Sequence, residues 1–103
     1  MIPISENTKR LIEAMFLQED WERVSACLLS RCGDNLPLVA TGYDELAERI
    51  RFAVLKLSGG DFETLLEHMQ KAAVDWRDCL VAAGFGDDLY AHLSWKPDIE
   101  TQQ

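Results

Sequence analysis

A helical repeat of apolar residues runs through most of this chain and limits the folds open to it. Between residues 62 and 83 the apolar side chains return every three or four positions and stay on one stripe. That spacing is typical of one face of an α-helix, whereas a half-buried strand alternates apolar and polar residues. No segment shows a convincing strand pattern. The sequence therefore predicts an all-α, single-domain bundle of about four or five helices.

The N-terminal third carries two apolar stripes that point in different directions. A helix is predicted to begin at Ser5, whose hydroxyl can cap free backbone N–H groups. The two stripes differ by about 150° at 100° per residue, so one straight helix cannot serve both equally. We expect a break near Gln18–Asp20, with Asp20 capping a second helix that ends at Gly33; one long helix over residues 5–32 is the alternative. The stripes are Leu11, Ile12, Met15 and Phe16, then Leu17, Trp21, Val24 and Leu28.

The segment from residue 33 to residue 42 interrupts the helices. Pro37 excludes a helix interior, yet Leu36, Leu38 and Val39 are too apolar for a loop that lies freely in water. We interpret residues 33–42 as an extended apolar strap that lies over the core.

The next helix is predicted to begin after Thr41 or Gly42 and to stop at Gly59-Gly60. Most of its apolar residues share one face, but Phe52 and Leu55 point to the opposite side. Either this helix is central and contacted on two faces, or its second face meets another chain.

Asp61 is the predicted cap of the following helix, and Gly84 its C-terminal end, with Phe85 packing back on the last turn. Because the stripe does not slip at Asp75, residues 62–83 favour one helix; two helices, the second capped by Asp75, are the alternative.

A short fifth helix follows, capped by Asp87 and ending before Pro97. Residues 1–96 are thus predicted to form a single helical domain, and residues 97–103 a flexible C-terminal tail.

The net charge and the cysteines indicate which kinds of partner and which cell compartment suit this chain. The net charge is −8, from 18 acidic and 10 basic residues, and no basic cluster suited to a phosphate backbone is present. No apolar run approaches the ~20 residues of a membrane span, and the first residues do not resemble a signal peptide. Three cysteines without an export signal indicate reduced thiols. We therefore expect a cytoplasmic protein that binds neither nucleic acid nor membrane.

The cysteines, histidines and Asp88 are the candidate metal-binding or redox residues. For each of them a purely structural role is the favoured interpretation. Cys27 and Cys32 are five residues apart, which fits neither a redox pair nor a zinc site. His68 and Cys79 would lie about 16 Å apart along one straight helix. Asp88 and His92 have suitable spacing on the last helix, but a metal needs further ligands, so a surface hydrogen bond is the favoured interpretation.

No phosphate-binding glycine motif or nucleophile–base arrangement is recognisable. We therefore predict no catalytic residue, metal, cofactor or small-molecule ligand.

Four apolar or aromatic residues are the candidate interface: Phe52, Leu55, Tyr90 and Trp95. Tyrosine and tryptophan are enriched at the centres of protein contacts, and a short terminal helix offers them little burial. Core packing within the monomer is the favoured alternative, because a small domain needs most of its aromatic residues.

These observations predict a small acidic protein that acts by protein–protein contact, as a binding or regulatory module, with a homodimer as one form. One alternative is an inhibitor or immunity-type protein that neutralises a basic partner, since the chain is acidic. A third and weaker alternative is a metal protein or enzyme that uses Asp88 and His92.

Overall fold

Five helices and no strand make up the described part of this chain, which confirms the all-α, single-domain class. The structure is a computed structural model and describes residues 2–33, 36, 43–88 and 90–97. The helices are α1 (Glu6–Met15), α2 (Gln18–Arg31), α3 (Tyr43–Ser58), α4 (Phe62–Ala83) and α5 (Ala91–Ser94).

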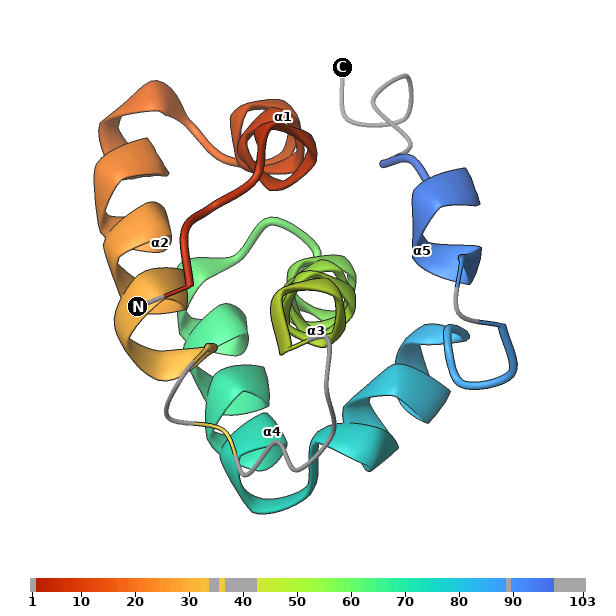
Figure 1. Cartoon of the computed structure of the whole chain (residues 1–103). Helices are drawn as coiled ribbons and strands as arrows, with labels where there is room; N and C mark the ends of the chain where they lie inside the picture. Colours follow the sequence, from red (N-terminus) through yellow and green to blue (C-terminus); the bar gives the residue numbers. More distant parts are fainter. Residues whose placement is uncertain (1, 34–35, 37–42, 89, 98–103) are drawn as a thin grey trace.

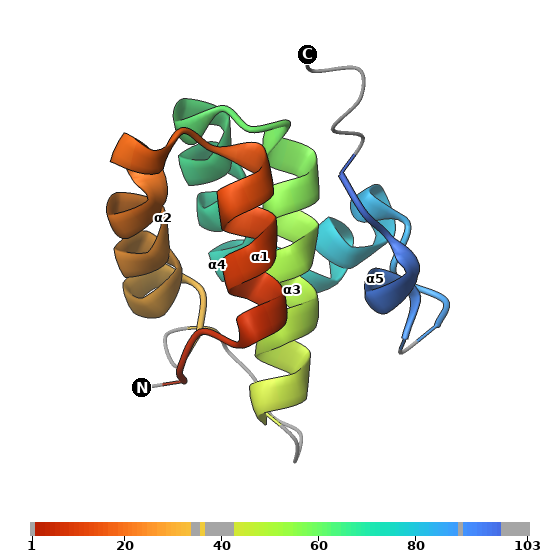
Figure 2. The ribbon, with the colours of Figure 1, turned by 90° about the horizontal axis from the view of Figure 1, so that it is seen from above.

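Helix α3 lies at the centre of the bundle. Figure 1 looks along its axis, with α1 beside it, α4 bending around it and α5 on the far side from α2. Figure 2 shows α1 and α3 side by side with similar axis directions. Both faces of α3 are buried, Ile50 and Val54 on one and Phe52 and Leu55 on the other. Of the two alternatives for this helix, the structure has the one in which it is contacted on two faces.

Helix α4 has the predicted limits but is not one straight helix. Asp75 adopts a non-helical conformation, with φ −150° and ψ 92°. Its carboxylate accepts a hydrogen bond from the backbone N–H of Arg77 at 3.1 Å, as a cap of the following turn would. The expectation of a single unbroken helix was therefore wrong. Figure 1 shows the two halves of α4 on different sides of α3. Apolar residues of both halves belong to the core, so the apolar pattern continues across the bend.

Both ends of α4 form as predicted. Asp61 is the N-cap and accepts a hydrogen bond from Thr64 N at 2.9 Å, and its hydrogen bonds with Thr64 hold the pKa of the carboxyl below its usual value. At the other end Gly84 has a positive φ of 82°, which glycine adopts without strain. Phe85 N donates to Leu80 O at 2.8 Å, which completes a Schellman-type cap and returns the Phe85 ring to the core.

The break between α1 and α2 exists but lies slightly before the predicted position. Ser5 caps α1 by accepting from Thr8 N, as expected. The turn falls at Phe16 and Leu17, and α2 begins at Gln18 without a side-chain cap. Asp20 does not cap; it lies in the first turn and pairs with Arg23 at 2.8 Å. The acidic side chain stabilises the N-terminus through the helix dipole rather than through capping.

Gly33 follows α2 at the predicted position, because α2 ends at Arg31 and Cys32 is its C-cap, but Gly33 is not among the glycines with a positive φ. Gly33 is needed for space rather than for a left-handed turn. A Cβ atom there would lie 2.9 Å from Nη2 of Arg51. Leu36 is buried and its N–H donates to Gly33 O at 3.0 Å. The rest of the predicted strap, residues 34–35 and 37–42, lies outside the described residues.

The C-terminal helix is shorter than predicted. The predicted cap, Asp87, does not cap it: the N-cap is Tyr90, without a side-chain hydrogen bond. In the turn before α5, the Asp88 carboxylate accepts a hydrogen bond from Tyr90 N at 2.9 Å. The chain leaves the helical conformation at Trp95, ahead of Pro97. Most of the predicted tail, residues 98–103, lies outside the described part.

Candidate functional site

Two of the four predicted interface residues belong to the chain's own core. Phe52 and Leu55 are 3% and 0% exposed. The ring of Phe52 meets His92 edge-on, with ring centroids 5.0 Å apart. The interface assignment fails for both residues in this fold, because the bend at Asp75 and helix α5 bring other parts of the chain onto the second face of α3.

The other two predicted interface residues differ from each other. Tyr90 is 68% exposed and begins the turn into α5. Trp95 is half-buried, with its ring centroid 6.3 Å from that of Phe85 and 5.7 Å from the ammonium group of Lys56. Trp95 therefore packs mainly against the chain, and only Tyr90 presents a large free surface.

Asp88 and His92 do not form the predicted surface pair. His92 is 5% exposed, and its Nε2 lies 3.6 Å from Oε2 of Glu48, which is on α3. The Asp88 carboxylate instead accepts a hydrogen bond from Tyr90 N in the turn before α5. In the part of the chain that the structure describes, no three histidine, cysteine or carboxylate residues gather in a group that could hold a metal ion.

The cysteines are free thiols, and two of them are buried. The prediction that Cys79 and His68 lie about 16 Å apart was wrong, because α4 bends between them. The Cys79 thiol donates a hydrogen bond to the backbone carbonyl of His68 at 3.7 Å. Burial raises the pKa of Cys79, and the nearby Asp78 carboxylate raises it further. Burial likewise raises the pKa of Cys32 to about 12. Both thiols are therefore protonated and weakly reactive near neutral pH.

A line of polar side chains connects the two ends of the chain through α3. The Ser5 hydroxyl donates to Oε1 of Glu48 and also lies 3.0 Å from the Thr8 hydroxyl. The other oxygen of the Glu48 carboxylate faces His92. The Glu48 carboxylate thus lies between Ser5 and His92. A nucleophilic serine needs a histidine base in direct contact, so this arrangement is not a serine–histidine catalytic pair. The Ser5 hydroxyl also accepts from Thr8 N, so its observed role is to cap α1.

Arg51 is the largest buried polar residue, at 1% exposure. Three of its nitrogens donate to backbone carbonyls: Nε to Cys32 at 2.7 Å, Nη1 to Pro3 at 2.8 Å and Nη2 to Ile2 at 2.7 Å. The guanidinium therefore binds the N-terminal segment and the end of α2 to α3. No motif marks Arg51 in the sequence; the signal that it is buried is that its neighbours one helical turn away, Ala47 and Leu55, are both apolar.

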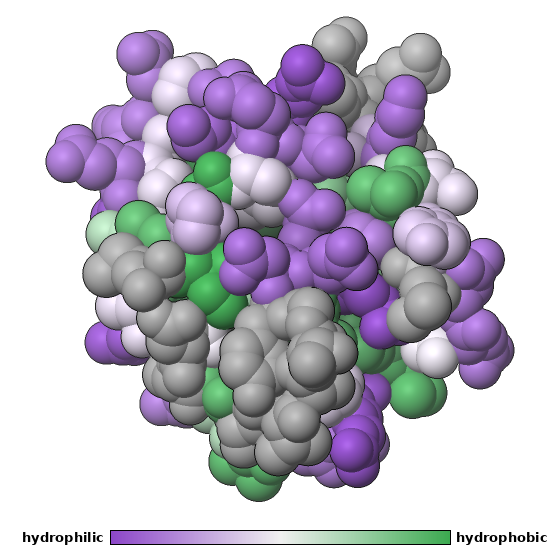
Figure 3. Space-filling model, in the orientation of Figure 1, coloured by the Kyte–Doolittle hydropathy of each residue, from purple (hydrophilic) through white to green (hydrophobic). Residues whose placement is uncertain are grey.

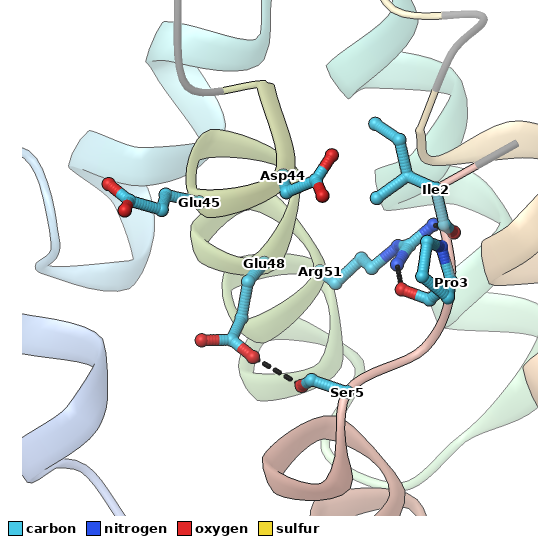
Figure 4. Close-up of a pocket in the computed structure, with 7 residues that line it drawn as sticks. All are labelled: Ile2, Pro3, Ser5, Asp44, Glu45, Glu48 and Arg51. Carbon is cyan, nitrogen blue, oxygen red and sulfur yellow. Dashed lines mark hydrogen bonds between the residues drawn. The ribbon is translucent and has the colours of Figure 1, made fainter.

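A pocket of about 260 Å³ opens between the N-terminal segment and the first turns of α3 (Figure 4). Its carboxylates come from α3, and Figure 4 shows that Asp44, Glu45 and Glu48 point in different directions along the helix. The Arg51 guanidinium points toward the N-terminal segment, where its donors are already used by carbonyls. These charged side chains therefore do not converge on one point of the pocket. Its lining is Ile2, Pro3, Ser5, Asp44, Glu45, Glu48 and Arg51.

Large apolar side chains remain exposed mainly in the last third of the described chain. Five such residues are exposed in the described part of the chain, and four of them lie between residues 74 and 93. One lies just before the bend of α4 at Asp75, one lies after it, and two lie at α5. Figure 3 shows apolar surface at the right and lower right, over these elements. The fifth, Leu17, lies in the turn between α1 and α2. The four residues, which we call the C-terminal surface, are Val74, Val81, Tyr90 and Leu93.

Comparison of the chain with known protein families, with curated proteins and with solved structures finds no match. Among the described helices, none is both long and apolar enough to cross a membrane.

Proposed function

We propose that this protein is a binding module that acts through protein–protein contact, with the C-terminal surface as its contact region. The supporting observation is the concentration of exposed Val74, Val81, Tyr90 and Leu93 in one stretch of 20 residues. Single exposed apolar residues are ordinary, but several large ones in one region are typical of interaction sites.

The fold gives this proposal a physical basis. The core of the bundle already contains Phe52, Leu55 and Phe85, so the residues left outside are not needed to cover α3. Tyr90 and Leu93 are three positions apart across the start of α5, and Val81 lies against the Gly86 backbone at the preceding turn. A partner that covers these side chains would remove apolar area from water, which favours association.

The proposed compartment is the cytoplasm. Cys27, Cys32 and Cys79 are all free, and an odd number of free thiols fits a reducing environment.

Site-directed photocrosslinking tests the contact region in living cells. We would introduce p-benzoyl-phenylalanine at Val81 and Tyr90, and at Leu17 as the control, because Leu17 and Val81 are both 69% exposed. The proposal expects discrete crosslinked protein at Val81 and Tyr90 and none at Leu17. A product of twice the chain mass identifies a homodimer, and a larger or smaller product another protein. Equal crosslinking at all three positions, or none at Val81 and Tyr90, contradicts the proposal.

A further inference from the structure

The C-terminal surface carries acidic as well as apolar side chains. Between residues 74 and 93 the chain has four aspartates and one arginine. Asp75, Asp78, Asp87 and Asp88 are all exposed, and the guanidinium of Arg77 lies 5.1 Å from the ring of Trp76. The exposed apolar side chains are therefore accompanied by an excess of negative charge.

The arrangement along α4 places the two kinds of side chain next to each other. In the half that follows Asp75, Trp76 is half-buried and Cys79, Leu80 and Ala83 are buried, so this side of the helix faces the bundle. The exposed side carries Asp78 and Val81, three positions apart and hence neighbours on the helix surface. In the turn before α5, the Asp88 carboxylate contacts the backbone of exposed Tyr90 through the hydrogen bond from Tyr90 N.

We infer that the partner of the C-terminal surface is a basic amphipathic segment of another protein, which places apolar side chains on Val81, Tyr90 and Leu93 and lysine or arginine side chains near Asp78 and Asp87. This inference rests on the proposed function and names its partner class. Charge complementarity supplies the argument, because potentials of opposite sign meet across specific interfaces.

A second copy of this chain is the less suitable occupant. A twofold symmetric contact brings the same surface of both copies together. The aspartates of one C-terminal surface would then face those of the other, and the whole chain carries a net charge of −8. Like charges brought together oppose association. Nucleic acid and anionic lipid are disfavoured for the same electrostatic reason.

The test uses two synthetic peptides of about 18 residues, which is five helical turns. Both have the same amphipathic pattern of leucine, but the polar positions are lysine in the first peptide and glutamate in the second. We expect the lysine peptide to bind the full chain and the glutamate peptide not to bind, as measured by fluorescence anisotropy. Val81→Ser with Tyr90→Ser should weaken binding about tenfold, whereas Leu17→Ser should leave it unchanged. Sodium chloride at about 0.5 M should also weaken it, because it screens surface charge.

Charge variants separate a local contact from general attraction to an acidic protein. Asp78→Asn with Asp87→Asn removes two exposed charges from this region, and Glu19→Gln with Glu22→Gln removes two exposed charges from α2. The first pair should weaken lysine-peptide binding several-fold more than the second. Equal effects of the two pairs, or equal binding of both peptides, overturn the inference. Crosslinking at Val81 without lysine-peptide binding would retain the contact region and reject the basic partner.

Discussion

The Arg51 side chain joins three segments that are far apart in the sequence. Burying a cation is unfavourable unless its donors are satisfied, and here three backbone carbonyls accept from it. The carbonyls of Ile2 and Cys32 depend most on Arg51, because both residues are buried. Arg51 thus stabilises the fold by fixing the N-terminal segment against α3, and Gly33 leaves the space that the guanidinium occupies.

Replacing this residue should therefore destabilise the protein strongly. We expect Arg51→Met to lower the free energy of unfolding by about 3 kcal/mol, because it leaves buried carbonyl groups without donors. Arg51→Lys should recover less than half of the loss, since one ammonium group cannot reach all three carbonyls. Urea unfolding followed by circular dichroism measures both effects. Arg10→Met, on the exposed side of α1, is the control, and equal unfolding midpoints for the Arg51 and Arg10 variants would contradict this role.

The buried thiol of Cys32 predicts a loss of stability in alkaline solution. Its pKa is raised by burial from 9.0 to about 12, so between these values the unfolded chain releases a proton that the folded chain retains. The unfolded state then binds fewer protons, and the free energy of unfolding falls as pH rises through this window. Below pH 9.0 the contribution is fully present. Cys32→Ala should flatten the decline measured by urea unfolding from about pH 8.5 to 10.5, and a wild-type decline no steeper than that of Cys32→Ala would refute the assignment.

Among the elements, the turn from α3 to α4 is fixed by contact with α1. Gly59 and Gly60 both have positive φ, 60° and 86°, which non-glycine residues adopt at some cost. A Cβ at Gly60 would lie 2.7 Å from the backbone oxygen of Met15, at the end of α1, while a Cβ at Gly59 would meet nothing within 4 Å.

The two glycines therefore form a matched pair for substitution. Gly59→Ala should cost about 1 kcal/mol, from backbone strain alone. Gly60→Ala should cost about 3 kcal/mol, because the α1 backbone must also move. Thermal unfolding by calorimetry compares the two variants. Equal losses at the two positions would mean that the close approach of this turn to α1 contributes nothing to stability.

Local signals in the sequence were sufficient to predict most helix ends but not the bend in α4. Ser5, Asp61 and the Gly84–Phe85 cap act on groups within five residues of themselves, so their patterns could be read directly. The apolar spacing continues across Asp75 because both halves of α4 pack against the central helix α3. The spacing is the same whether the helix axis is straight or bent, so it could not predict the bend.

The same limit applies to the candidate site. Glu48 and His92 lie 44 residues apart, and Arg51 reaches Ile2 across 49 residues, so no local spacing predicts these contacts. For Phe52 and Leu55 the sequence leaves open an interface or the core, because it contains no signal for what covers them; both are buried. Tyr90 could be identified as exposed because the helix that carries it is short.

For the whole molecule, the net charge of −8 predicts how stability responds to salt. Self-repulsion destabilises a compact state of high net charge, and salt screens that repulsion. The exposed ion pair Glu6–Lys9 and the partly exposed pair Asp20–Arg23 act in the opposite sense, but pairs near the surface contribute little. Repulsion should therefore dominate.

We accordingly expect the unfolding temperature to rise by a few degrees between low salt and about 0.5 M sodium chloride. The same scan on a variant with Glu13, Glu19, Glu22 and Glu63 each changed to glutamine should rise less, since these four exposed carboxylates no longer repel their neighbours. An unfolding temperature that falls with salt would indicate that ion pairs outweigh repulsion.

The central position of α3 also has a consequence for the order of events during synthesis. Translation proceeds from the N-terminus, so α1 and α2 leave the ribosome before the helix that covers them exists. Helix α3 in turn emerges with Phe52 open to water, and that face is fully covered only after α4 and then His92 have followed. A nascent chain stalled before residue 92 would therefore present an apolar surface to chaperones that the finished protein conceals.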